Sequence, residues 1–195
     1  MASFKKRLMA YLLDMIIIVL ISTFIGLIIP VSDNLVNLSK EATNIQTSYL
    51  NNEISFTKYF NQMADIMKDI DKEQVLTYVV SVLLTLSYFV IYPFYNKGQT
   101  LGKKRFKIRV VNDLEEDPSI NELLIRNIII NNLGILLIQL LIIFILPATS
   151  YYITLTCLSF LQVIVIIISV FTIIRRKDKK GLHDLVAKTK VIEVK

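Results

Sequence analysis

The apolar run from residue 11 to residue 29 limits the possible folds of this chain more than any other feature. It is long enough to cross a bilayer as a helix, and yet it contains a carboxylate, Asp14. An ionised aspartate in the middle of a spanning helix costs roughly 2.5 to 3.5 kcal/mol on insertion scales. Arg7, Ala10 and Asp14 follow one another at helical spacing, which places them on one face. We therefore expect that face to point into a helix bundle.

The composition indicates a membrane protein. Of the 195 residues 54% are hydrophobic, and the mean hydropathy is +0.57, which is too apolar for an ordinary soluble domain. The formal net charge is +6, but the basic residues flank apolar runs, so membrane orientation and anionic lipid explain them better than nucleic acid. The lone cysteine, Cys157, lies in an apolar run, which excludes a disulfide framework or a CxxC metal site within the chain.

Further apolar runs at 75–95, 128–146 and 151–174 predict an all-α integral membrane protein with four transmembrane helices in one domain. The N-terminus holds three basic residues, the segment 96–126 seven and the tail 175–195 eight, so that eighteen of the 22 lie on one side. The positive-inside rule then places both termini in the cytoplasm and the segment 30–74 outside it. We expect a multi-pass protein of the cell membrane.

Shorter patterns lie outside these runs. Apolar residues recur at helical spacing in 56–70, which predicts an amphipathic helix that caps the bundle or lies in the membrane interface, the cap being favoured because its polar face carries both signs of charge. Alternation at 105–111 and 187–194 predicts two strands that pair beneath the bundle. Ser119 and Glu122 have the spacing of a capping box, which predicts a helix start.

Several polar residues fall at one depth inside the predicted spans, about 7 to 12 Å from the cytoplasmic ends at ~1.5 Å per residue. They are Asp14, Ser87, Tyr88, Asn131, Asn132 and Ser169. They form either a hydrogen-bonded layer that locks the helices or the floor of a cavity for an ion or solute; a third interpretation leaves Asp14 in a hydrated margin. Arg126 is either a positive-inside anchor or the counter-ion of Asp14. Gln139 and Gln162, deeper in the third and fourth spans, are placed to bond to each other.

Motifs in separate parts of the chain resemble the RDD family of small multi-pass membrane proteins. The residues that carry the resemblance are Arg7, Ala10 and Asp14 in the first span, Gly98, Gln99, Gly102, Lys103 and Arg109 in the segment after the second, Arg126 before the third, and Gly181, His183 and Asp184 in the tail. The resemblance implies one arginine and two aspartates as landmarks. Arg7 and Asp14 match the first two, no later span holds a second aspartate, and Asn131 and Asn132 stand near its expected place.

The glycines of the segment 98–102 permit a turn with positive φ, which we favour over an anion-binding nest formed with Lys103 and Lys104. His183 is the only histidine, so we predict no metal site and no cofactor. The sequence contains no nucleophile motif, and we do not expect an enzyme.

Two functions remain open. In the first, Asp14 titrates during transport of a monovalent cation, a proton or a small solute, which the resemblance also implies because cation/proton antiport has been proposed for some members. In the second, the chain is a non-catalytic partner or assembly protein whose basic cytoplasmic face binds another membrane complex or anionic lipid. We expect a homo-oligomer or a membrane-complex partner, because four short spans rarely enclose a path alone.

Overall fold

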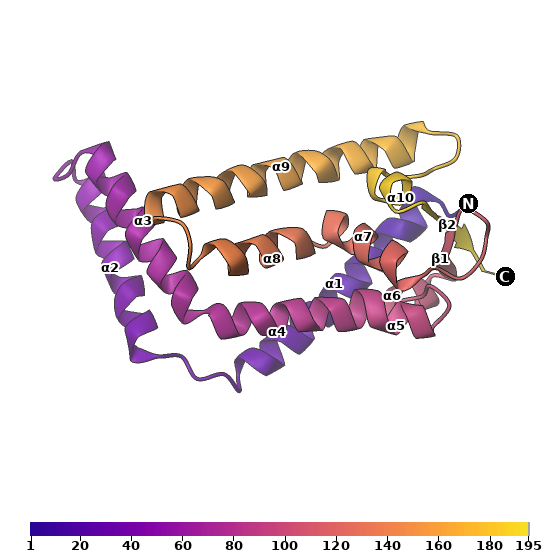
Figure 1. The fold of residues 1–195 in the computed structure, drawn as a ribbon, viewed down its shortest axis with the longest axis horizontal. Helices are drawn as coiled ribbons and strands as arrows, with labels where there is room; N and C mark the ends of the chain where they lie inside the picture. The colour runs from indigo at the N-terminus through magenta and orange to yellow at the C-terminus, as the bar shows by residue number, and fades with distance from the viewer. Residues whose placement is uncertain (195) are drawn as a thin grey trace.

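The computed structural model describes residues 1–194 as an elongated helical bundle with a small sheet at one end (Figure 1). Both termini lie at the end that carries the sheet. The elements in chain order are α1 (Phe4–Gly26), α2 (Asp33–Leu50), α3 (Phe56–Glu73), α4 (Val75–Leu86), the π-helix η1 (Ser87–Ile91), α5 (Tyr92–Tyr95), α6 (Leu101–Arg105), β1 (Ile108–Asn112), α7 (Ile120–Ile130), α8 (Leu133–Ile142), α9 (Ala148–Arg175), α10 (Leu182–Val186) and β2 (Thr189–Glu193).

Three helical segments are long and apolar enough to cross a membrane: α1, the continuous stretch Val75–Tyr95, and α9. Their apolar side chains are largely exposed, for example Phe24 on α1 and Phe160 on α9, as expected of surfaces that face lipid. The first helix starts seven residues before the predicted span, because the side chain of Ser3 caps it by accepting a hydrogen bond from the Lys6 amide. Three of the four predicted spans are thus continuous helices.

The third predicted span is bent. Helices α7 and α8 meet at 78° and qualify as one span only when they are counted together. Asn131 ends α7, and Asn132 follows with φ +58°, a left-handed conformation that asparagine tolerates better than most residues. The predicted span over 128–146 is therefore not one continuous helix, and residues 1–194 hold three candidate spans, or four if the bent pair is one.

The segment 30–74 is a helical hairpin rather than a loop with a single helix. The predicted helix is present as α3, and it lies across the end of the bundle in contact with α9 (Figure 1). Helix α2, which packs along α3, was not predicted, although Leu35, Leu38, Ala42, Ile45 and Tyr49 recur at helical spacing among the Asn, Ser and Thr residues. The contact of α3 with α9 agrees with the capping role.

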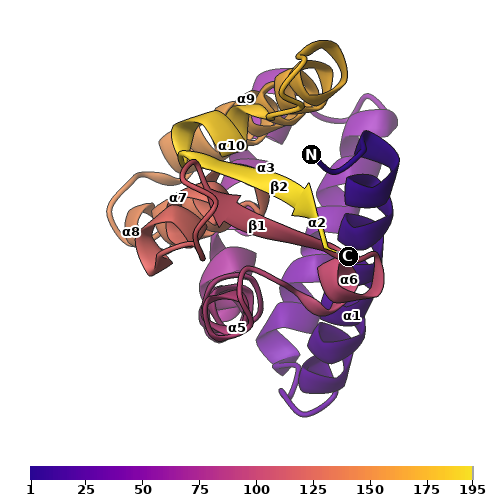
Figure 2. The ribbon, with the colours of Figure 1, turned by 90° about the vertical axis from the view of Figure 1, so that its right-hand side faces the viewer.

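The two predicted strands pair as expected. β1 and β2 form an antiparallel sheet in which Val110 lies opposite Val191 (Figure 2). Their inward side chains join Ala10 of α1 and Leu123 of α7 in the buried core at this end of the molecule. Segments from the beginning, middle and end of the chain therefore meet in one layer, which we call the terminal layer.

The predicted glycine turn is present just before α6. Gly98 has φ +77°, and a Cβ atom added to it would lie 2.0 Å from the carbonyl oxygen of Val110. Thr100 then caps α6 by accepting a hydrogen bond from the Lys103 amide. This turn brings the start of α6 against α1.

Candidate functional site

Asp14 is the centre of a hydrogen-bonded cluster that joins α1 to η1 and α6. Its carboxylate accepts hydrogen bonds from the Tyr88 hydroxyl at 2.6 Å, the Thr100 hydroxyl at 2.6 Å and the Gly102 amide at 2.8 Å. The Lys103 ammonium lies 4.0 Å from it. Only 1% of Asp14 is exposed. The carboxylate is thus surrounded by hydrogen-bond donors, which offset the free-energy cost of burying it in an apolar helix.

The close approach of α6 to Asp14 depends on a residue without a side chain. A Cβ atom added to Gly102 would lie 2.2 Å from the carbonyl oxygen of Ala10 and 2.7 Å from Oδ1 of Asp14. Since the first of these is a backbone atom, it cannot rotate away. Ala10 and Gly102, both motif residues, are therefore the contact at which α6 reaches α1.

The π-helix η1 positions Tyr88, and a proline explains part of this irregularity. Pro93 has no amide hydrogen, so it leaves the carbonyl oxygen of Phe89, four residues earlier, without its helical donor. The side-chain amide of Asn127 donates to that oxygen at 2.9 Å. Asn127 thereby ties α7 to the same irregular turn that presents Tyr88 to Asp14, and such π-turns often occur at functional sites.

A second buried aspartate, Asp184 in α10, joins two arginines. It accepts from Nη1 of Arg7 at 2.7 Å and from the Gly181 amide at 2.9 Å, and it pairs with Arg126. Burial acts to raise the pKa of this carboxyl, but the positive charges of Arg126 and Arg7 outweigh burial and hold the pKa well below its usual range. Asp184 is therefore ionised at neutral pH.

His183, next to Asp184, is a neutral buried histidine. Its Nδ1 lies 2.6 Å from the Ser169 hydroxyl of α9, and its Nε2 lies 3.6 Å from Oδ1 of Asp184. Burial, with the nearby positive charge of Arg126, lowers the pKa of His183 to about 3. Within residues 1–194 no group of three His, Cys, Asp or Glu side chains is placed to hold a metal ion.

The predicted polar layer is divided among separate contacts. Asp14 bonds to Tyr88, Ser169 to His183, and Asn131 to Asn127. Ser87 begins the π-helix, and Asn132 is exposed at the bend between α7 and α8.

The structure excludes one of the two alternatives for Arg126 and differs from the expected place of the second aspartate. Arg126 bonds to Asp184 and to the Thr189 hydroxyl, so it is not the counter-ion of Asp14. The second buried aspartate beside Arg7 is Asp184, which lies in the tail and not in a span, where Asn131 and Asn132 were the expected substitutes.

The two glutamines do not bond to each other either. Gln139 donates to the Tyr151 hydroxyl and Gln162 to the carbonyl oxygen of Ile129. Two motif residues, Gln99 and Arg109, support the sheet region instead of the buried cluster, since Gln99 bonds to the carbonyl oxygen of Ile108 and Arg109 pairs with Asp117.

The sequence did not identify Thr100, although a threonine before a short helical stretch is a typical N-cap. It also missed Asp71 on α3, which accepts hydrogen bonds from the hydroxyls of Tyr78 at 2.5 Å and Tyr151 at 2.7 Å. Asp71 continues the spacing of Met63 and Met67 on the apolar face of α3. A carboxylate on such a face could have indicated a buried hydrogen-bonded residue.

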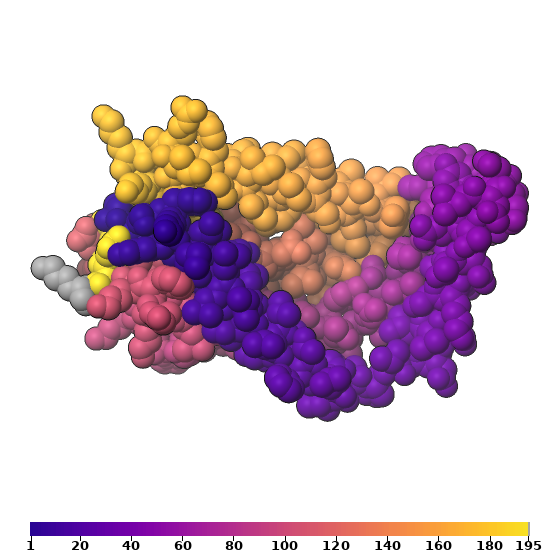
Figure 3. Space-filling model, turned by 180° about the vertical axis from the view of Figure 1, so that it is seen from behind, coloured from indigo at the N-terminus to yellow at the C-terminus, as the bar shows by residue number. Residues whose placement is uncertain are grey.

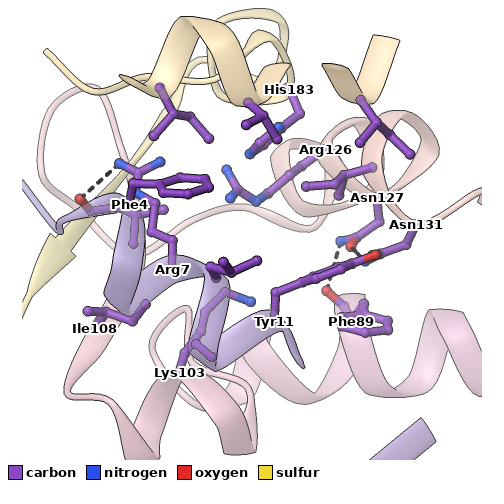
Figure 4. Close-up of a pocket in the computed structure, with 17 residues that line it drawn as sticks. Phe4, Arg7, Tyr11, Phe89, Lys103, Ile108, Arg126, Asn127, Asn131 and His183 are labelled. Atoms are coloured by element: carbon purple, nitrogen blue, oxygen red, sulfur yellow. Dashed lines mark hydrogen bonds between the residues drawn. The ribbon is translucent and has the colours of Figure 1, made fainter. Parts of the chain in front are cut away.

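A cavity of about 230 Å³ lies beside the two aspartate clusters, between α1, α7 and α9. Figure 4 shows Arg7, Lys103 and Arg126 reaching toward it from α1, α6 and α7. The complete lining is Phe4, Arg7, Leu8, Ala10, Tyr11, Phe89, Lys103, Ile108, Arg126, Asn127, Ile130, Asn131, Ile166, Val170, Ile173, His183 and Val191. Two buried polar atoms of these residues, Nε of Arg7 and Oδ1 of Asn131, have no hydrogen-bond partner among residues 1–194.

Comparison with protein-family models matches residues 1–188 to the model described as the RDD family, in agreement with the motifs of the sequence. The matched range includes α1 through α10 and both buried aspartates. Neither the curated proteins nor the solved structures give a match to the chain.

Proposed function

The chain belongs to the RDD family of multi-span membrane proteins, and on this premise we propose that it is a non-catalytic membrane partner protein whose terminal layer binds anionic lipid at the cytoplasmic face. In this proposal the two aspartate clusters hold the helices together, and neither is a transport site. The terminal layer is the cytoplasmic end, in accordance with the positive-inside rule.

The proposal rests on one observation: both carboxylate oxygens of Asp14 already accept hydrogen bonds from the protein. Its two oxygens accept three hydrogen bonds from groups on η1 and α6. A transported cation would have to displace these donors, and the lysine 4.0 Å away would repel it. The adjacent cavity is lined by three cationic side chains and by no carboxylate of the described chain. These features oppose cation binding.

The surface of the terminal layer supports a role in binding anionic lipid. Its exposed basic residues are Lys5, Lys97, Lys104, Arg105, Lys107, Arg175, Arg176, Lys177, Lys179 and Lys188. Basic residues near the surface of an anionic membrane contribute about 1 kcal/mol each to the attraction. The exposed apolar faces of α1 and α9 leave room for a second copy, and the homo-oligomer stays a prediction.

The transport part of the proposal is tested in sealed liposomes that contain only this protein. Sodium, potassium and proton gradients are imposed separately, and we expect no flux above that of empty liposomes. Flux that disappears in Asp14→Asn while the variant keeps the wild-type melting temperature would overturn the proposal, because Asp14 would then be a titrating site and not a lock.

The lipid part is tested by the melting temperature in mixed micelles. We expect phosphatidylglycerol to raise it more than phosphatidylcholine does, and the difference to shrink at high salt. Charge reversal at Lys177 and Lys179 should reduce the difference. The matched control reverses Lys40 and Lys58, which lie on the hairpin at the other end of the bundle, and should leave it unchanged. Equal effects of the two double variants would contradict the assignment to the terminal layer.

A further inference from the structure

The side chains around the cavity between α1, α7 and α9 carry a net positive charge. Three cationic side chains line it, Arg7, Lys103 and Arg126, and two buried carboxylates lie beside it, Asp14 and Asp184. The positive charges therefore outnumber the negative charges by one. Burial lowers the pKa of Lys103 to about 8, which leaves its ammonium mostly protonated at neutral pH. Each of these cations has a carboxylate within 4.0 Å, but Arg7 and Arg126 share Asp184, so an anion in this cavity would balance the remaining positive charge.

Arg7 also offers a directional donor. Its Nη1 and Nη2 are used by Asp184 and by the carbonyl oxygen of Val191, but its Nε has no acceptor within residues 1–194. The Arg7 side chain is only 8% exposed, so this N–H does not donate a hydrogen bond to bulk water. A buried donor left unpaired costs about 1 to 3 kcal/mol, which an acceptor on a ligand would recover. The other orphan atom, Oδ1 of Asn131, is an acceptor and does not contribute to anion binding.

Apart from Asn127, Asn131 and His183, the remaining walls of the cavity are mostly apolar and extend away from the charged end. On α9 they are formed by Ile173, Val170 and Ile166, which together cover about 10 Å of helix at ~1.5 Å per residue. Ile130 of α7 and Leu8 of α1 face the same space. The cavity thus pairs a cationic end, at the terminal layer, with an apolar end deeper in the bundle.

The cavity lies next to the surface that would face lipid. Figure 3 shows the molecule hollowed between α1 and α9, with the orange segment of α7 and α8 at the bottom of the hollow. Both bordering helices are candidate spans. A molecule already dissolved in the bilayer could therefore enter sideways, with its charged group toward the terminal layer.

From the charge excess, the unpaired Arg7 Nε and the apolar walls, we infer that this cavity binds the anionic headgroup and the adjoining acyl carbons of a membrane amphiphile. The ligand chemistry is a carboxylate or phosphate attached to an alkyl chain, as in a free fatty acid or an anionic phospholipid. The inference deepens the proposed function, since it names a specific lipid site where that function requires only surface attraction.

The test measures binding of radiolabelled palmitate to the purified protein in a non-ionic detergent. We expect saturation near one palmitate per chain, with little effect of salt because the Arg7 and Arg126 side chains are only 8% and 9% exposed. Displacement by phosphatidylglycerol would identify a phospholipid as the ligand, whereas palmitate binding that phosphatidylglycerol does not displace would identify a free fatty acid. Displacement by hexadecanol or by inorganic phosphate as effective as that by palmitate would overturn the inference, since it requires both charge and chain.

Two variants on one helix locate the site. Val170→Phe fills the cavity from α9 without touching either aspartate cluster, and it should weaken palmitate binding at least tenfold. Ile167→Phe is the matched control, because Ile167 is exposed and does not line the cavity, and it should bind as the wild type does.

If Val170→Phe does not fold, Lys103→Gln replaces it and should also weaken binding at least tenfold. Unchanged binding in a folded cavity variant would refute the site. The charge-reversal variant at Lys177 and Lys179, which tests the proposed function, should keep palmitate binding, so that failure of one proposal is distinguishable from failure of the other.

Discussion

Replacement of Asp184 by asparagine should destabilise the protein strongly. The change keeps the shape of the side chain but removes the charge that faces both Arg7 and Arg126. The Asp184 side chain is fully buried, so water cannot compensate for the loss. Removing one partner of a buried ion pair costs about 3 to 5 kcal/mol, because the other charge is left uncompensated.

The assay is thermal unfolding of the purified protein in detergent, followed by helical circular dichroism. For a chain of this size 1 kcal/mol corresponds to about 2 to 4 °C, so we expect the melting temperature to fall by roughly 6 to 20 °C. Asp178→Asn is the matched control in the same tail: Asp178 pairs with Arg176 at the surface, and exposed pairs contribute at most about 1 kcal/mol.

The pH dependence gives a further check on the same residue. Because the pKa of Asp184 is lowered in the folded state, its contribution is fully present above the unfolded pKa of about 3.9 and is lost only as the pH falls through the lower folded value. The wild type and Asp184→Asn should therefore differ by a constant amount from pH 5 to pH 8. Equal losses in Asp184→Asn and Asp178→Asn would refute the assignment of Asp184 as a buried lock.

Three other predictions concern the same layer and the orientation of the chain. Gly102→Ala should lower the melting temperature by several degrees, because its Cβ would collide with the Ala10 carbonyl oxygen, whereas Gly26→Ala meets no atom within 4 Å and should not lower it; equal melting temperatures would contradict the close contact. The pKa of His183 is lowered to about 3, so the unfolded state binds an additional proton between pH 3 and about 6.5, and stability should fall by up to about 1.4 kcal/mol per pH unit as the pH drops through that window. His183→Gln should remove this dependence, and an unchanged slope would show that other groups cause it. In a Cys157→Ser background, cysteines at Asn44 and Asn52 should react with an impermeant thiol reagent added outside cells, and cysteines at Asn112 and Lys188 should not; the reverse pattern would rule out cytoplasmic termini.

Local patterns in the sequence were enough to predict several elements. The apolar runs predicted α1 and α9, and alternation predicted both strands and their pairing. The spacing of Ser119 and Glu122 predicted the start of α7, where the structure contains the capping box. Each of these features depends on residues within a few positions of one another, which is the range that periodicity reports.

The partners of the charged residues could not be predicted in this way. Arg7 and Asp14 share a helix face, and yet Arg7 bonds to a residue 177 positions later and Asp14 to residues 74 and 86 positions later. Such contacts depend on how the bundle folds, and local periodicity contains no information on them. The bend at Asn131 was missed because the apolar residues around it extend over the length of a single span, although Asn131, Asn132 and Gly134 are residue types that interrupt helices.

The separation between Arg7 and Asp184 has a consequence for the order of events during synthesis. At roughly 5 to 20 residues per second, the ribosome adds Asp184 about 9 to 35 s after Arg7. The residues that enclose Asp14 are synthesised near the middle of this interval. Asp184, the partner of Arg7 and Arg126, is added only at its end. A chain interrupted before residue 184 would therefore hold Arg7 and Arg126 without the carboxylate that they share. Synthesis of residue 184 therefore supplies the side chain that ties the tail to the first helix.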